Sequence, residues 1–133
     1  MNAAERIREA VEDRSEASIL VREGIGNKAA LGKLYHAMLQ SLFVLLDIRD
    51  IGRLTHADVI ERFEREFLDR GRIGRNVGAV LRRTYDLTHE CDCEHMPLPT
   101  DGEVEAAQRT AAELVKKAET YLTGGDEDEG CAL

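Results

Sequence analysis

The most unusual run of chemically capable side chains lies in the C-terminal third of the chain. Residues 89–95 read His-Glu-Cys-Asp-Cys-Glu-His, so two histidines and two cysteines alternate with acidic residues. In an extended backbone, alternate side chains share one face. That face would carry His89, Cys91, Cys93 and His95. Imidazole and thiolate are preferred zinc ligands, so this segment is a candidate zinc site.

A helical backbone would arrange the same segment differently. On a helix, only residues three or four apart lie side by side. His89 would then pair with Cys93, and Cys91 with His95. The alternating pattern also lies outside the usual spacings of zinc ligands. The alternatives to a metal site are the polar end of a fraying helix with two reduced thiols, and thiol redox chemistry.

A second candidate is a cluster of arginines in residues 70–83, a stretch that contains no acidic residue although the chain has a net charge of −8. Guanidinium groups bind phosphate oxygens through paired hydrogen bonds. The cluster therefore predicts an RNA-binding patch. The alternatives are a solvated turn and arginines that pair with acids of the first helix or of a partner. The arginines are Arg70, Arg72, Arg75, Arg82 and Arg83.

Arg83 and His89 together are a candidate pair for metal-independent RNA cleavage. A histidine moves a proton near neutral pH, and an arginine stabilises the charge that develops on phosphorus. Six positions separate the two residues, so on a straight helix they face different sides. They would meet only after a helix break or across a dimer. His36 lies in an apolar segment, where we expect a core residue with satisfied hydrogen bonds.

Five stretches with helical periodicity must position these residues. We expect helices at about 2–23, 28–47, 55–71, 74–94 and 100–123, separated by glycines and by the two prolines, Pro97 and Pro99. Thr55 with Asp58, and Thr100 with Glu103, are typical of capping boxes. Short loops between helices favour an all-α, antiparallel up-and-down bundle of four or five helices over residues 1–123. We expect residues 124–133 to form an acidic, disordered tail.

The second of these stretches is the richest in hydrophobic residues. Apolar side chains in residues 28–47 cover far more than one helical face. A helix that is apolar nearly all round is either central in its own bundle or shared with a partner.

The composition excludes several classes of protein. No apolar run approaches the roughly 18–20 residues of a membrane span, and the polar start of the chain shows no signal peptide. Three cysteines, an odd number, fit reduced thiols better than a disulfide framework. We therefore expect a cytoplasmic protein. The net charge of −8 argues against bulk attraction to nucleic acid or anionic membranes.

Three blocks of sequence resemble the HEPN domain (higher eukaryotes and prokaryotes nucleotide-binding). Lys33–Gln40 is similar to the tyrosine-rich second helix of that family. Thr55–Phe63, followed by Glu66–Gly71, resembles its third block, and Leu81–Leu87 resembles its "LRRLYELR" stretch. Together with the final helix, the resemblance covers about residues 2–122.

The resemblance implies an antiparallel four- or five-helix bundle that is commonly a homodimer. Members often pair with a minimal nucleotidyltransferase, sometimes as a toxin–antitoxin couple. Active members cleave RNA with an arginine and a histidine separated by four to six residues, in a cleft between protomers. Arg83 and His89 match this spacing from a shifted register, because the family's arginine position falls on Thr88 and its downstream histidine or tyrosine position on Cys93.

Our first hypothesis for the function is a dimeric interaction module that partners a nucleotidyltransferase. Tyr35, Leu39 and Phe43 of the second helix would form the interface.

Two further hypotheses follow from the candidate sites. The chain is an endoribonuclease that uses Arg83 and His89, helped by Arg82, or it is a metal-binding sensor that uses the segment from His89 to His95. Zinc is the one cofactor that the sequence suggests.

Overall fold

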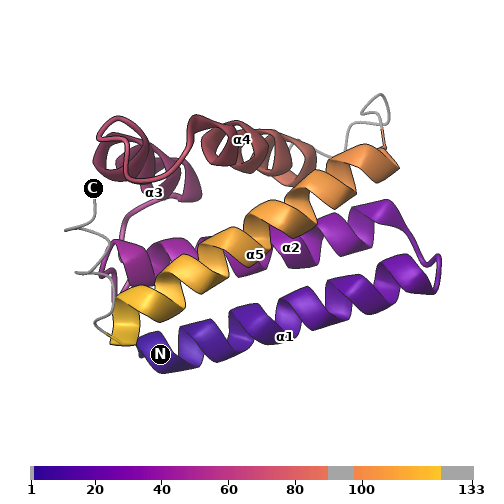
Figure 1. Cartoon of the computed structure of the whole chain (residues 1–133), viewed down its shortest axis with the longest axis horizontal. Coiled ribbons are helices and arrows are strands. Elements are labelled where there is room, and N and C mark those ends of the chain that lie inside the picture. The colour runs from indigo at the N-terminus through magenta and orange to yellow at the C-terminus, as the bar shows by residue number, and fades with distance from the viewer. Residues whose placement is uncertain (1, 90–97, 124–133) are drawn as a thin grey trace.

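The computed structural model describes residues 2–89 and 98–123, and helices make up nearly all of that part (Figure 1). The all-α prediction is confirmed, since the described residues contain no strand. A π-helical turn, η1, directly follows the third helix. The elements are α1 (Ala3–Arg22), α2 (Asn27–Leu45), α3 (His56–Phe63), η1 (Glu64–Leu68), α4 (Arg75–His89) and α5 (Asp101–Thr123).

Side-chain caps define the starts of three helices. Thr55 Oγ1 accepts from the backbone N–H of Asp58 at 3.0 Å, and the Asp58 carboxylate accepts in return from that of Thr55 at 3.0 Å. Thr100 and Glu103 exchange the same pair of bonds at the start of α5. Both predicted capping boxes are therefore confirmed. Asn2 caps α1 in the same way, and each cap satisfies backbone donors that a helix start leaves unpaired.

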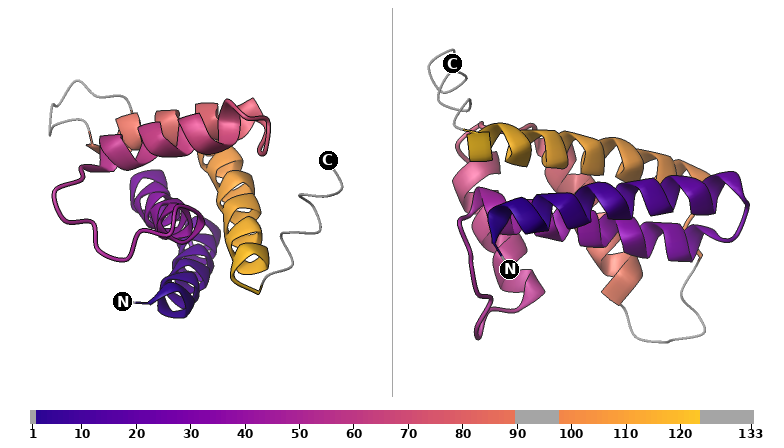
Figure 2. Two further views of the ribbon diagram at one scale, coloured as in Figure 1. Left: turned by 90° about the vertical axis from the view of Figure 1, so that its left-hand side faces the viewer. Right: turned by 90° about the horizontal axis from the view of Figure 1, so that it is seen from below.

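Helix α2 is the centre of the bundle. It forms an antiparallel hairpin with α1, and α5 packs along both of them. Helices α3 and α4 lie across the long helices and also contact α2 (Figure 2). Leu34, Met38 and Leu42 are at most 1% exposed. The sequence left open whether this apolar helix is central in its own bundle or shared with a partner. In the structure it is central in its own bundle.

The residues predicted to form a dimer interface are buried within one chain. Tyr35, Leu39 and Phe43 are 5%, 4% and 6% exposed. The neighbouring helices of the same chain already remove these side chains from water. They are core residues in this fold, and a partner would have to contact other side chains.

The predicted third helix is not a single α-helix, because it changes at Glu64 into the π turn η1. The wider turn allows the consecutive residues Phe67 and Leu68 both to be buried, and the Phe67 ring stacks on Phe63 with centroids 5.3 Å apart. Gly78 of α4 lies against this turn. A Cβ atom at residue 78 would lie 2.2 Å from Leu68 Cδ1, so α4 packs on η1 at the closest approach that glycine allows.

Other expectations are only partly testable. Helix α4 begins at Arg75 and is described as far as His89, whereas residues 90–97 and the predicted tail at 124–133 lie outside the described residues. Within the described part of the chain, no helix is long and apolar enough to cross a membrane.

Replacing Leu39 separates a core role from an interface role. We expect Leu39→Ala to lower the free energy of unfolding by about 2–5 kcal/mol, because it leaves a cavity beneath the packed helices. Chemical denaturation measures this loss, and light scattering on the folded variant should show the wild-type mass. Unchanged stability with a lower mass would instead identify Leu39 as a dimer contact.

Candidate functional site

Two histidines and two tyrosines from three helices meet at one corner of the bundle. We name Tyr35, His56, Tyr85 and His89 the imidazole–tyrosine cluster. His56 Nδ1 lies 3.1 Å from His89 Nε2 and 3.3 Å from the Tyr35 hydroxyl. The ring of His89 stacks on Tyr85 and meets the edge of Tyr35, with centroids 4.3 and 4.7 Å away. The cluster joins residues from α2, α3 and α4.

The ends of two helices position the histidines. His56 is the first residue of α3, directly after its Thr55 cap, and His89 is the last residue of α4 as described. Tyr35 supplies a buried floor from the middle of α2. His89 is exposed, while His56 and Tyr85 are half-buried. The two imidazoles are therefore held on a rigid base and remain accessible to solvent or a ligand.

Hydrogen bonds fix the proton positions in the cluster. The Thr88 hydroxyl donates to the Thr84 carbonyl at 2.8 Å, so its oxygen accepts from His89 Nδ1 at 2.9 Å. His89 Nδ1 therefore carries a hydrogen. In the neutral ring, the other nitrogen, Nε2, is then a bare acceptor that faces His56.

The environment opposes charge on His56 and on Tyr35. Burial lowers the pKa of His56 below its ordinary 6.5, and the nearby His89 and His36 lower it further by repulsion between like charges. Burial also raises the pKa of Tyr35, so its phenol stays protonated at neutral pH. At pH 7 the cluster therefore presents the neutral ring of His56 beside the neutral hydroxyl of Tyr35.

The structure does not bring Arg83 to His89. The Arg83 guanidinium binds the Glu103 carboxylate of α5, with Nε and Oε2 2.8 Å apart. The nearest titratable partner of His89 is His56, from a segment far away in the sequence. Arg83 and His89, six positions apart in the sequence, therefore do not contact each other within this chain.

Most of the predicted RNA-binding arginines also have partners within the chain. Arg82 forms a two-pronged ion pair with Glu64 of η1, at 2.8 and 2.9 Å, which lowers the pKa of that carboxyl group. Arg75 lies 3.7 Å from Asp69. These two, like Arg83, pair with acids of the same chain. None of these acids lies in α1, so the first helix does not supply the partners expected from the sequence.

The other two arginines of the predicted patch lie near the end of η1. Arg72 places its guanidinium 4.2 Å from the centre of the Phe67 ring, which is a cation–π contact. Arg70 is exposed. The patch is therefore largely committed to contacts that hold α4, η1 and α5 together.

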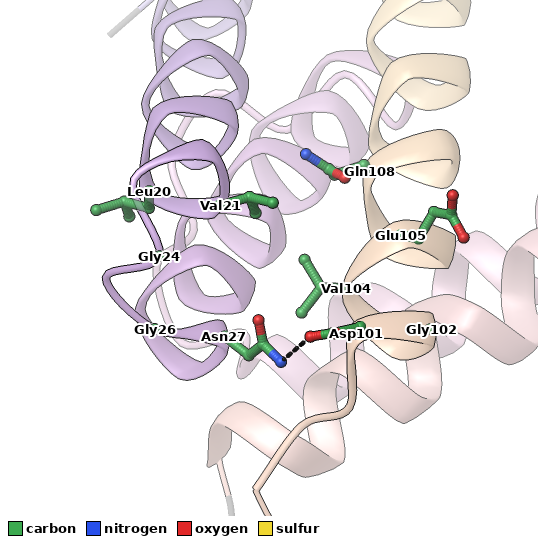
Figure 3. Close-up of a pocket in the computed structure, with 10 residues that line it drawn as sticks. All are labelled: Leu20, Val21, Gly24, Gly26, Asn27, Asp101, Gly102, Val104, Glu105 and Gln108. Atoms are coloured by element: carbon green, nitrogen blue, oxygen red, sulfur yellow. Dashed lines mark hydrogen bonds between the residues drawn. The ribbon is translucent and has the colours of Figure 1, made fainter.

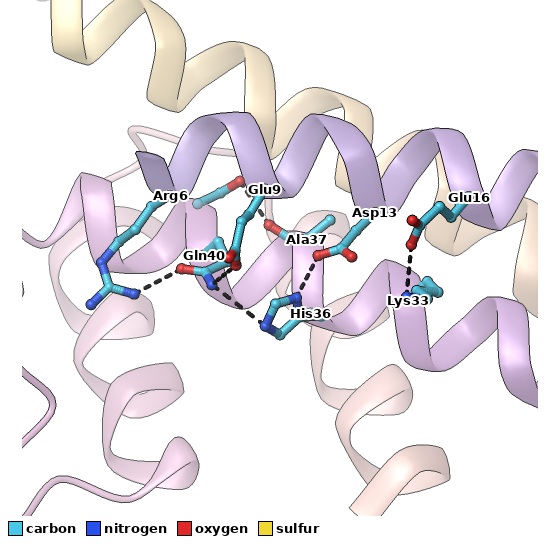
Figure 4. A network of polar contacts seen from close by, with 9 residues as sticks. Arg6, Glu9, Asp13, Glu16, Lys33, His36, Ala37 and Gln40 are labelled. Atoms are coloured by element: carbon cyan, nitrogen blue, oxygen red, sulfur yellow. Dashed lines mark hydrogen bonds and ion pairs between the residues drawn. The ribbon is translucent and has the colours of Figure 1, made fainter. Parts of the chain in front are cut away.

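A separate polar network joins α1 to α2 (Figure 4). His36 binds the carboxylate of Asp13, and the Gln40 amide donates to Glu9 at 2.9 Å and accepts from Arg6 at 2.7 Å. The His36 side chain is 49% exposed. The prediction that His36 is a core residue is wrong, because it lies at the edge of the helix pair. Its hydrogen bonds are satisfied, as expected.

A pocket of about 660 Å³ lies between the α1–α2 turn and the start of α5 (Figure 3). The amide of Asn27 donates to Asp101 across its mouth, at 2.9 Å. Its charged lining residues, Asp101 and Glu105, are both acidic, so the pocket does not favour an anion such as phosphate. None of the cluster residues lines it. The full lining is Leu20, Val21, Gly24, Gly26, Asn27, Asp101, Gly102, Val104, Glu105 and Gln108.

The predicted zinc segment is only represented by its first residue. His89 is described, whereas Cys91, Cys93 and His95 lie outside the described residues. Among residues 2–89 and 98–123, no three or more histidine, cysteine or acidic side chains form a group that could hold a metal ion. His56 and Tyr85 were not singled out from the sequence, although each lies in a block that resembles the HEPN family.

Comparison with known proteins gives one distant relative. No protein-family profile matches the chain, and no solved structure matches it. A UPF0332 protein of Thermotoga maritima is 26% identical over 95 residues, which cover 71% of this chain. The match spans 66% of that relative, just under two thirds of its length. The name of this relative specifies no activity.

The pKa of His56 tests the geometry of the cluster. We expect His56 to titrate below 6.5, and the His89→Ala substitution to move its pKa upward by removing one repelling charge. As the pH falls, His56 is then protonated at a higher pH in the unfolded chain than in the folded chain. The contribution of His56 to stability is therefore complete above about pH 6.5 and is lost as the pH falls through the folded pKa. NMR titration of the imidazole signals measures both values, and a pKa at or above 6.5 would contradict the cluster.

Proposed function

We propose that this chain is a HEPN-like helical module that acts by binding a protein partner, and that the partner is a minimal nucleotidyltransferase of a toxin–antitoxin-type pair. One observation carries the proposal. The three blocks that resemble the family each supply one residue to the same cluster: Tyr35, His56 and Tyr85. Blocks that are distant in sequence converge on one accessible corner of the fold.

The exposure of the cluster suits a binding surface. His89 is exposed and Tyr85 is half-buried, and both rest on the buried Tyr35. Aromatic side chains held on a rigid base are typical centres of binding energy in protein interfaces. The net charge of −8 also favours a basic protein surface over a polyanion such as RNA.

The same proposal includes a homodimer, as the resemblance implies. Because Leu39 and Phe43 are buried within one chain, a second copy would contact residues outside this part of α2.

Binding to a purified minimal nucleotidyltransferase tests the proposal. We expect the double substitution Tyr85→Ala and His89→Ala to weaken the complex at least ~10-fold, because it removes about 1.4 kcal/mol or more of contact energy. Tyr121→Ala is the matched control, since Tyr121 is 39% exposed at the far end of α5. Titration calorimetry gives the two Kd values. No complex with the wild type, or equal weakening by both variants, would refute the proposal.

Metal-independent RNA cleavage is a second candidate, favoured by the contact between His56 and His89. A neutral imidazole with a lowered pKa is suited to act as a general base, and a neighbouring imidazole can supply a proton to the leaving group. In this arrangement His56 replaces Arg83 as the partner of His89, because Arg83 is bound to Glu103. The roles differ, since His56 would move a proton whereas Arg83 was expected to stabilise the charge on phosphorus.

Cleavage of tRNA in the presence of a chelator tests the second candidate. We expect His56→Ala and His89→Ala each to reduce the rate by roughly 10²–10⁴-fold, and Arg83→Ala to leave it nearly unchanged. His36→Ala is the matched histidine control, because its partner is Asp13. Equal cleavage by the wild type and both histidine variants would show that the activity does not belong to the cluster.

A further inference from the structure

We propose that His56 and His89 form a two-histidine site for a transition-metal cation of the zinc class, between the start of α3 and the last described turn of α4. The proposal goes beyond partner binding and does not depend on it. It also differs from the zinc site suggested by the sequence, because its second ligand, His56, lies 33 residues from His89 along the chain.

The separation of the two nitrogens carries the proposal. His56 Nδ1 and His89 Nε2 are 3.1 Å apart. Two imidazole nitrogens that each lie ~2.0–2.1 Å from one ion are themselves about 2.9–3.4 Å apart at ligand angles of roughly 90–110°. The side chains are therefore already at the spacing that a shared ion requires, on two helices that pack against the same central helix.

The hydrogen bonds around His89 leave its Nε2 atom without a hydrogen, so that Nε2 can bind a metal ion. Because Thr88 Oγ donates to Thr84, it accepts from His89 Nδ1 and leaves Nε2 bare. A metal-binding histidine commonly donates its other N–H to a neighbouring oxygen in this way, which fixes both the tautomer and the ring orientation. The oxygen of Thr88 is thus an outer-shell partner that directs the lone pair of His89 towards His56.

His56 can also present a free nitrogen to the ion. A metal ion competes with protons for imidazole nitrogen, so each ligand binds through a nitrogen that carries no hydrogen. In one neutral tautomer of His56, Nδ1 is bare and faces His89 Nε2 at 3.1 Å. The Tyr35 hydroxyl lies 3.3 Å from the same nitrogen.

The surrounding charge favours a cation over a phosphate. Asp86 and Asp58 are exposed on α4 and α3 within one turn of His89 and His56, whereas Arg82 is bound to Glu64. Neutral nitrogen donors favour Zn²⁺, Co²⁺ or Ni²⁺ over Mg²⁺ and Ca²⁺, which prefer oxygen.

Zinc titration of the reduced, full-length protein tests the proposal. We expect one Zn²⁺ per chain, with a shift of the imidazole nitrogen signals of His56 and His89 in NMR spectra. Mg²⁺ should cause no such shift. His56→Ala and His89→Ala should each weaken binding at least ~10-fold, as loss of a ligand weakens a metal site no less than loss of an outer-shell partner does. The control Tyr121→Ala, near the C-terminal end of α5 and 39% exposed, should bind as the wild type does.

The outcome for His56→Ala distinguishes this site from the one predicted from sequence. If zinc binds as tightly to His56→Ala as to the wild type, the ion is held without His56 and the proposal is wrong. It is also wrong if the wild type binds no zinc. His89 is exposed, so His89→Ala should retain the fold. Thr88→Val is a further variant that keeps both ligands, and we expect it to bind more weakly than the wild type because Nε2 is then no longer favoured as the bare nitrogen.

Discussion

The structure depends on the burial of α2 among the other helices, which leaves only a narrow exposed edge that includes His36. Removing apolar surface from water stabilises a fold by about 25 cal/mol per Å², and most of that surface in α2 faces another helix of the same chain. Its contacts reach α1, α3, α4 and α5. Because Tyr35 belongs to this helix and also forms the floor of the imidazole–tyrosine cluster, the core and the candidate site share one support. Partner binding, proton transfer and metal binding would all use side chains that Tyr35 and α2 hold in place.

A polar seam complements this apolar packing on the side of α1. Lys33 pairs with Glu16 at 2.7 Å, next to the bond between His36 and Asp13. Hydrophobic contact alone is non-directional, whereas each of these pairs is satisfied in only one alignment of the two helices. The seam therefore sets the register of the α1–α2 hairpin. It also accounts for Asp13, a carboxylate that is nearly buried yet has a partner.

The sequence predicted local structure well and contacts between distant segments poorly. Helical periodicity and the caps at Thr55 and Thr100 lie within a few residues of one another, and the structure confirms both. The π turn at Glu64 was missed, because its extra residue is favoured by the packing of Leu68 against Gly78 and not by a local signal.

In the candidate site, too, local features were predictable from the sequence and contacts between distant segments were not. His89 was recognised through its unusual neighbours in the sequence, but its contact with His56 depends on how α3 and α4 cross α2. Likewise, the ion pair between Arg83 and Glu103 links two helices, so sequence spacing along α4 alone could not reveal it. The blocks chosen by resemblance contain Tyr35, His56 and Tyr85, but the resemblance did not show that these residues meet.

Gly78 has a consequence at the opposite end of its helix. It touches Leu68 near the start of α4, and His89 follows eleven positions later, about 16 Å further along the axis at ~1.5 Å per residue. At that length, a tilt of about 5° would displace the imidazole by roughly 1.4 Å, nearly half of the spacing between the two histidine nitrogens. The absence of a side chain at Gly78 lets α4 lie close to η1. The tilt of α4 that results from this contact affects the distance between the His56 and His89 nitrogens, three helical turns away.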